Sequence, residues 1–124
     1  MRKEDQLSQQ IATYLNVQYP NVIYHFDVGS GGTSSIGMAM RNKRLNKWLG
    51  YPDLFIAKRK HMFCGLFIEI KVDSIFKKDG SMKKSDHLTK QRSILNLLRS
   101  EGYETMFGCG FDQIKQIIDD YLKP

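Results

Sequence analysis

Apolar residues at helical spacing mark three stretches of the chain. They predict helices from about Lys3 to Val17, from about His87 to Ser100, and from Phe111 to Leu122. In each stretch the apolar positions line one side of a helix. The first stripe consists of Leu7, Ile11, Tyr14 and Leu15, the second of Leu88, Ile94, Leu95 and Leu98, and the third of Phe111, Ile114, Ile117, Ile118, Tyr121 and Leu122.

Four short apolar runs predict strands at residues 22–28, 54–57, 65–71 and 104–109. The polar turn at 58–62 joins the second and third runs and suits an antiparallel hairpin. Because these middle runs are apolar on both faces, helices should cover both sides of the sheet. The sequence therefore predicts an α/β fold with a central mixed four-stranded sheet. The order is αβββαβ followed by a C-terminal helix, within a single domain that spans residues 1–124.

The segment Gly29–Ser35 is too rich in glycine and serine for regular structure, which predicts a mobile loop. A phosphate-binding P-loop would end in Gly-Lys-Ser/Thr, whereas Gly37 is followed by Met38 and Ala39. A dinucleotide fingerprint is also excluded, because no helix with a downstream strand-end acid follows in the βαβ frame. The loop therefore predicts neither kind of nucleotide site.

Three charged residues stand where buried strands are expected. Asp53 begins the second strand, and Glu69 and Lys71 lie late in the third. Strand alternation puts Glu69 and Lys71 on one face, about 6.6 Å apart along the strand. Paired carboxylates and main-chain carbonyls are the hard oxygen ligands that suit Mg²⁺ or Mn²⁺. They predict a metal site at which Lys71 orients or activates a water. The alternative is a buried Lys–Glu pair that holds the strand ends together.

Two helical residues are further candidates for this site. Gln91 falls within the apolar stripe of its helix, and a buried amide must be hydrogen-bonded, so it should face other polar groups inside the protein. Glu4 projects from the same helix face as Leu7, one turn nearer the N-terminus. For Glu4 the alternative is a solvated carboxylate favoured by the helix dipole.

The net charge of +6 favours a polyanionic partner such as nucleic acid. Four cations beside Trp48 and two in the lysine-rich segment 74–86 are candidates for phosphate contacts, while Trp48 itself is expected in the core. These six candidates are Arg41, Lys43, Arg44, Lys47, Lys77 and Lys78.

The chain has no apolar run of the roughly 20 residues that a membrane span requires, and it begins with polar residues rather than a secretory leader. The two cysteines, Cys64 and Cys109, both lie in apolar strand-like contexts and are expected to be small core residues rather than a disulfide framework. These features predict a reducing, intracellular protein.

Pro52-Asp53, then 15 residues, then Glu69-x-Lys71 resembles the signature of the PD-(D/E)xK nucleases. The longer segments Gly50–Phe55 and Gly65–Lys71, followed by His87-Leu88-x-x-Gln91 and Gly102-Tyr103, are similar to the VRR-NUC (virus-type replication-repair nuclease) domain. The resemblance covers nearly the whole chain and is to the stand-alone, phage-like form. It implies a location in the cytoplasm of a bacterium or of an infected host cell. One departure is Val72-Asp73 after Lys71, where more basic or polar character is expected.

The resemblance implies a restriction-endonuclease-like core and a Mg²⁺-dependent DNA endonuclease in replication, repair or recombination, selective for branched or junction DNA. It implies that Asp53, Glu69 and the Ile70 carbonyl ligate the metal, with Glu4 contacting it through water. Lys71 would serve the nucleophilic water and Gln91 would be a supporting amide. A homodimer is expected by analogy, because one site per domain requires two copies to cut both strands symmetrically.

Three other interpretations remain. The first is a nucleic-acid-binding domain of the same fold that is inactive or depends on a partner. The second is a zinc site drawn from His61, Cys64, His87 or Cys109, although no second pair at zinc-finger spacing accompanies His61-x-x-Cys64. The third is a structural or partner-binding protein.

Overall fold

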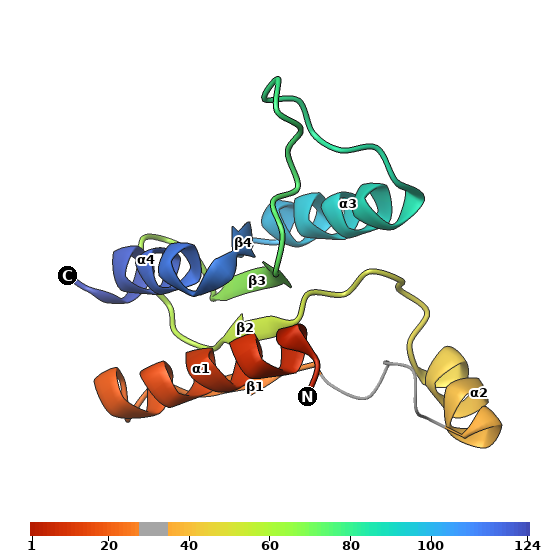
Figure 1. Cartoon of the computed structure of the whole chain (residues 1–124). Helices are drawn as coiled ribbons and strands as arrows, with labels where there is room; N and C mark the ends of the chain where they lie inside the picture. Colours follow the sequence, from red (N-terminus) through yellow and green to blue (C-terminus); the bar gives the residue numbers. More distant parts are fainter. Residues whose placement is uncertain (28–34) are drawn as a thin grey trace.

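A computed structural model describes residues 1–27 and 35–124. Four strands form one sheet in the order β1-β2-β3-β4, in which β1–β2 and β2–β3 are antiparallel and β3–β4 is parallel. Helices lie on both sides of it (Figure 1). The elements are α1 Lys3–Gln18, β1 Tyr24–Phe26, α2 Ile36–Leu45, β2 Leu54–Ile56, β3 Leu66–Lys71, α3 Asp86–Ser100, β4 Glu104–Cys109 and α4 Gly110–Leu122.

The main core lies between the sheet and the helices α1 and α4. Alternate residues of the central strands contribute to it, and each is almost fully buried because the two helices cover that face. Its members are Leu7, Ile11, Leu15, Leu54, Ile56, Leu66, Ile68, Ile70, Ile114, Ile117, Ile118, Tyr121 and Leu122.

The opposite face of the sheet carries aromatic rings beneath α3. Phe55 and Phe67 stack with ring centroids 4.4 Å apart, and Tyr103 meets Phe67 edge-on at 5.1 Å. Tyr51 packs edge-on against Phe67 from the segment before β2. This face also holds the charged residues of β3, so α3 covers both an aromatic cluster and a polar group.

The mixed four-stranded sheet, its antiparallel hairpin and the helices on both faces confirm the predicted fold class. The predicted order is incomplete, because α2 is an additional helix in a segment that was given no regular structure. Ser35 begins it by accepting the Met38 N–H at 3.2 Å. Residues 28–34, on which the predicted mobile loop and the end of the first predicted strand fall, lie outside the described residues.

The helix α2 stands away from the sheet, and none of its residues is buried (Figure 1). The expectation that Trp48 packs in the core is wrong: 58% of its surface is exposed. The Lys47 ammonium lies 5.2 Å from the centre of the Trp48 ring. The segment therefore presents both its cations and its aromatic ring to the outside.

The turn between β2 and β3 is fastened to the last turn of α4. Lys60 Nζ donates to the Leu122 carbonyl at 2.8 Å, and His61 Nε2 donates to the Tyr121 carbonyl at 3.0 Å. In return, the Tyr121 hydroxyl donates to the Lys58 carbonyl at 2.5 Å. The bonds from Lys60 and His61 satisfy carbonyls at the end of α4 that have no intrahelical partner.

Among residues 1–27 and 35–124, no helix has the length and apolar character needed to cross a membrane.

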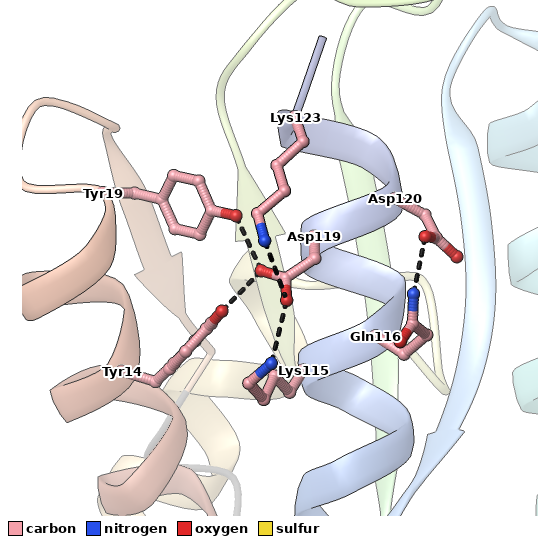
Figure 2. A network of polar contacts seen from close by, with 7 residues as sticks. All are labelled: Tyr14, Tyr19, Lys115, Gln116, Asp119, Asp120 and Lys123. Carbon is pink, nitrogen blue, oxygen red and sulfur yellow. Dashed lines mark hydrogen bonds and ion pairs between the residues drawn. The ribbon is translucent and has the colours of Figure 1, made fainter.

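A buried carboxylate, Asp119, joins α4 to α1 (Figure 2). Its Oδ1 accepts hydrogen bonds from the hydroxyls of Tyr14 at 2.5 Å and Tyr19 at 2.6 Å, while Lys115 and Lys123 approach its Oδ2 at 3.0 and 3.8 Å. Burial alone would raise the pKa of Asp119, but these donors outweigh it and lower the pKa to about 2. The ionised carboxylate is therefore part of the folded state.

Replacing Asp119 with Asn should lower the free energy of unfolding by about 2 kcal/mol near neutral pH, because the ionised form is lost. The pKa of Asp119 lies below its ordinary value of 3.8, so its contribution is complete above about pH 4. It declines as the pH falls toward about 2, and the two proteins should converge there. Urea unfolding at several pH values measures the difference.

Asp120→Asn is the matched control, because Asp120 is exposed and accepts a surface hydrogen bond from Gln116 at 2.7 Å (Figure 2). Its substitution should change stability by less than about 0.5 kcal/mol. Equal losses in the two variants would show that the junction between α1 and α4 does not depend on the Asp119 charge.

Candidate active site

Asp53 occupies the point where the β2–β3 hairpin opens. The pairing of the two strands ends at Leu54 and Ile68, so the Ile70 N–H has no β2 residue opposite it. The Asp53 side chain takes that place, and its Oδ2 accepts the Ile70 N–H at 2.8 Å. The Asp53 carbonyl accepts the Asp27 N–H at 2.7 Å, just after β1. Asp53 thus ties β1, β2 and β3 together at one end of the hairpin.

Glu69 lies on the face of β3 that α3 covers, with 3% of its surface exposed. Its Oε1 accepts a hydrogen bond from Gln91 Nε2 at 3.0 Å. Its Oε2 is buried and has no hydrogen-bond partner among the described residues. A buried carboxylate oxygen without a donor is costly, and such an atom marks a place for a cation or a water.

Gln91 connects Glu69 to Lys71. The Lys71 ammonium donates to Gln91 Oε1 at 2.7 Å, and Gln91 itself is 5% exposed. The expectation that a buried Gln91 faces polar groups is confirmed by these contacts. Lys71 spends one of its three N–H groups on Gln91, so two remain for a water or a phosphate oxygen.

Gly50 allows the segment before Asp53 to pass directly against α3. Its φ of +79° favours glycine, and an added Cβ would lie 3.1 Å from the Gln91 nitrogen. The backbone that leads into Asp53 and the backbone that carries Gln91 are therefore in contact. This close approach holds the two halves of the site together.

Negative charge is concentrated around Glu69. Burial raises the pKa of Glu69, and the neighbouring Asp53 carboxyl group raises it further. Lys71 lowers the pKa, and the charge of Asp27 raises it by a smaller amount. Burial also raises the pKa of Asp27, followed by the charge of Asp53. Both raised pKa values show that the ionised carboxylates are unfavourable at these positions. A bound cation would stabilise the ionised forms.

The residues present fit a hard divalent cation. Asp53 and Glu69 offer carboxylate oxygens, one of them the orphaned Glu69 Oε2. The Ile70 carbonyl points to the same side of β3 as the Ile70 N–H, which Asp53 holds. In the described part of the chain no three His, Cys, Asp or Glu side chains are gathered to hold a metal. Two carboxylates plus waters and substrate phosphates are the set in which Mg²⁺ is usually bound.

Other predicted site residues lie outside this group. Glu4 is exposed in the first turn of α1 and forms no hydrogen bond or ion pair with a described residue. That turn lies on the side of the sheet where β3 ends (Figure 1). The six candidate phosphate-binding cations lie on or just after α2 and in the segment before α3. The Lys47 side chain contacts the Trp48 ring.

The zinc alternative receives no support from the described residues. His61 is engaged with the end of α4, and His87 contacts Gln91 instead of a cysteine. Cys64 and Cys109 are separate free thiols. The expectation that both lie in the core is wrong, because Cys64 is exposed and Cys109 is only partly buried.

Two residues that the structure places at the site were not assigned to it from the sequence, although His87 was named within the family motif and as a zinc candidate. Asp27 follows β1 and lies beside Asp53. The sequence feature that could have indicated it is an acid at the end of a predicted strand next to the strand that follows Pro52-Asp53. His87 Nε2 lies 3.1 Å from Gln91 Nε2. The sequence feature that could have indicated it is the spacing of four residues, which places both side chains on one face of a helix. Neither residue could be selected without the pairing of β1 with β2 or the orientation of α3.

The fold of this chain is shared with a solved protein structure. No family model matches the chain, and no curated protein matches it. A solved structure of a "VRR_NUC domain protein" superposes with a TM-score of 0.70 at 23% identity, covering 99% of this chain and 90% of that chain. The protein therefore shares the α/β fold of that VRR_NUC domain protein. The resemblance inferred from the Pro-Asp and Glu-x-Lys motifs is confirmed at the level of the fold.

Gly50→Ala should destabilise the protein by about 1 kcal/mol more than Gly80→Ala. Both glycines have a positive φ, +79° and +87°, so both substitutions incur the left-handed strain. An added Cβ at Gly80 meets nothing within 4 Å, whereas at Gly50 it presses on the backbone of α3. Urea unfolding of the two variants measures the difference, and equal losses would contradict the close approach.

Proposed function

We propose that the chain is a metal-dependent nuclease that hydrolyses phosphodiester bonds in DNA. The observation that carries the proposal is the buried Glu69 Oε2, which has no hydrogen-bond partner among the described residues and lies beside Asp53 and a hydrogen-bonded Lys71. A structural Lys–Glu pair would leave no carboxylate oxygen without a partner. The fold shared with a VRR_NUC domain protein supports the same conclusion.

Each residue of the site has a role that follows from its position. Asp53 and Glu69 would hold Mg²⁺ or Mn²⁺, the Ile70 carbonyl would add a ligand, and Glu4 would reach it through water. When bound, such an ion polarises the scissile phosphate and lowers the pKa of a bound water. Lys71 orients the attacking water with its two remaining N–H groups and offsets charge at the phosphate. Gln91 fixes the Lys71 ammonium by its Oε1.

The DNA backbone would run along α2 and the segment before α3. The six cations named above are the proposed phosphate contacts, and they stand on parts of the chain that bury little. Trp48 is exposed beside Lys47, so its ring is accessible for stacking on a base. The exposure of Trp48, which the sequence did not predict, favours a nucleic-acid partner over a purely structural segment.

The substrate is proposed to be branched or junction DNA, cut by a homodimer. Symmetric cleavage of two strands requires two sites, and each chain supplies one. The principal alternative is a binding domain of the same fold that is inactive or requires a partner. The completeness of the group formed by Asp53, Glu69, Lys71 and Gln91 favours the enzyme.

Asp53→Asn and Glu69→Gln should each reduce Mg²⁺-dependent DNA cleavage by about 100-fold or more, because each removes a charged metal ligand. DNA binding, measured by fluorescence anisotropy, should stay within about threefold, since the cations are untouched. Asp112→Asn, an exposed acid in the first turn of α4, is the control and should cut as the wild type does.

The assay uses labelled single-stranded, duplex, flap, nicked and four-way junction DNA, with and without EDTA. Faster cleavage of the branched substrates and a solution mass of twice 14.4 kDa are expected. A wild-type protein that binds these DNAs but cuts none of them would establish the binding-domain alternative. Wild-type rates in either ligand variant would refute the assignment of the site.

Replacing Arg41 and Arg44 with Gln, or Lys77 and Lys78 with Gln, should weaken DNA binding and flatten its salt dependence. Each lost phosphate contact reduces the slope of log K against log salt by about 0.9 for duplex DNA. Arg59→Gln is the control, because Arg59 is an exposed cation in the β2–β3 turn, at the other end of the hairpin from Asp53. A change of slope in the control alone would place the DNA elsewhere.

A further inference from the structure

The side-chain amide of Gln91 has three neighbours, and one of them is not part of the proposed catalytic group. Its Nε2 donates to Glu69 Oε1 at 3.0 Å, and its Oε1 accepts from Lys71 Nζ at 2.7 Å. The third neighbour is His87, whose Nε2 lies 3.1 Å from Gln91 Nε2. His87 precedes Gln91 by one helical turn on α3, so the two side chains share a face of the helix.

The chemistry of the amide determines the state of the imidazole. An amide nitrogen carries two hydrogens and donates both, so it cannot accept a hydrogen bond. One hydrogen goes to Glu69, and the other is directed to His87. His87 Nε2 must therefore be the acceptor, which places the ring proton on Nδ1 and leaves the imidazole neutral.

Only one orientation of the Gln91 amide is compatible with both Glu69 and Lys71. With oxygen and nitrogen exchanged, the Gln91 oxygen would face the Glu69 oxygen, and the Gln91 N–H groups would face the Lys71 ammonium. Gln91 is 5% exposed, so water has little access to relieve either conflict. His87 is exposed and stands on the outer side of this amide.

We propose that His87 is a positioning residue for the catalytic group. Its neutral imidazole accepts the second Gln91 N–H and holds the amide in the one orientation that serves Glu69 and Lys71 together. His87 thus acts on Lys71 through Gln91, at the point where Lys71 is to orient the attacking water. The catalytic consequence rests on the proposed nuclease function, whereas the tautomer and the hydrogen bond do not.

Three variants separate the acceptor from the bulk of the side chain. His87→Leu removes the acceptor, and His87→Gln restores a carbonyl oxygen at a similar reach. Asn96→Leu places a leucine elsewhere on the exposed surface of α3 and is the control. We expect His87→Leu to lower kcat about tenfold with KM within twofold of the wild type. His87→Gln should retain at least half of the wild-type kcat, and the control should retain all of it.

A second measurement needs no cleavage and no metal. Long-range ¹H–¹⁵N correlation spectra of the metal-free protein should show His87 as the Nδ1–H tautomer. The side-chain amide resonances of Gln91 should shift in His87→Leu and stay near their wild-type positions in His87→Gln. These spectra test the hydrogen bond directly, since a general change in packing would shift the amide in both variants.

The outcomes separate this inference from the proposed function. An Nε2–H tautomer, an unchanged kcat in His87→Leu, or equal loss in His87→Leu and His87→Gln would each overturn the positioning role. If the wild type cuts no DNA, the nuclease proposal fails, and the spectra alone decide whether His87 holds Gln91.

Discussion

The hydrogen bond between the Asp53 carboxylate and the Ile70 N–H is the interaction on which the site depends. It replaces a strand pairing that β2 is too short to provide, and it fixes the residue before β2 against the end of β3. The Asp53 side chain therefore accepts a backbone hydrogen bond and also supplies a charged carboxylate to the site. Because the Asp53 carbonyl also receives the Asp27 N–H, this corner of the sheet is braced from both neighbouring strands.

Much of this arrangement follows from local sequence. The alternation in β3 places Glu69 and Lys71 on one face, and the position of Gln91 within an apolar stripe implies that it turns into the protein. Both inferences need only the period of a strand or a helix. The fold class also follows, because two strands that are apolar on both faces require helices on each side.

Other features depend on contacts between distant segments and could not be predicted in this way. Trp48 is apolar, yet it is exposed because the segment that carries it does not fold back onto the sheet. The polar partners of Glu69 are set by how α3 lies across β3, and the proximity of Asp27 is set by the pairing of β1 with β2. Hydrophobic periodicity carries no information about any of these placements.

The attachment of the β2–β3 turn to the end of α4 bears on how the chain folds. Lys60 and His61 act as a cap for α4, although about sixty residues separate them from the carbonyls that they satisfy. Local residues supply only part of the C-terminal capping of this helix, so α4 and the hairpin gain stability together. Such mutual dependence makes folding cooperative across the whole sheet. It also means that the hairpin, whose open end carries the site, is anchored at its closed end by a helix from the far end of the sequence.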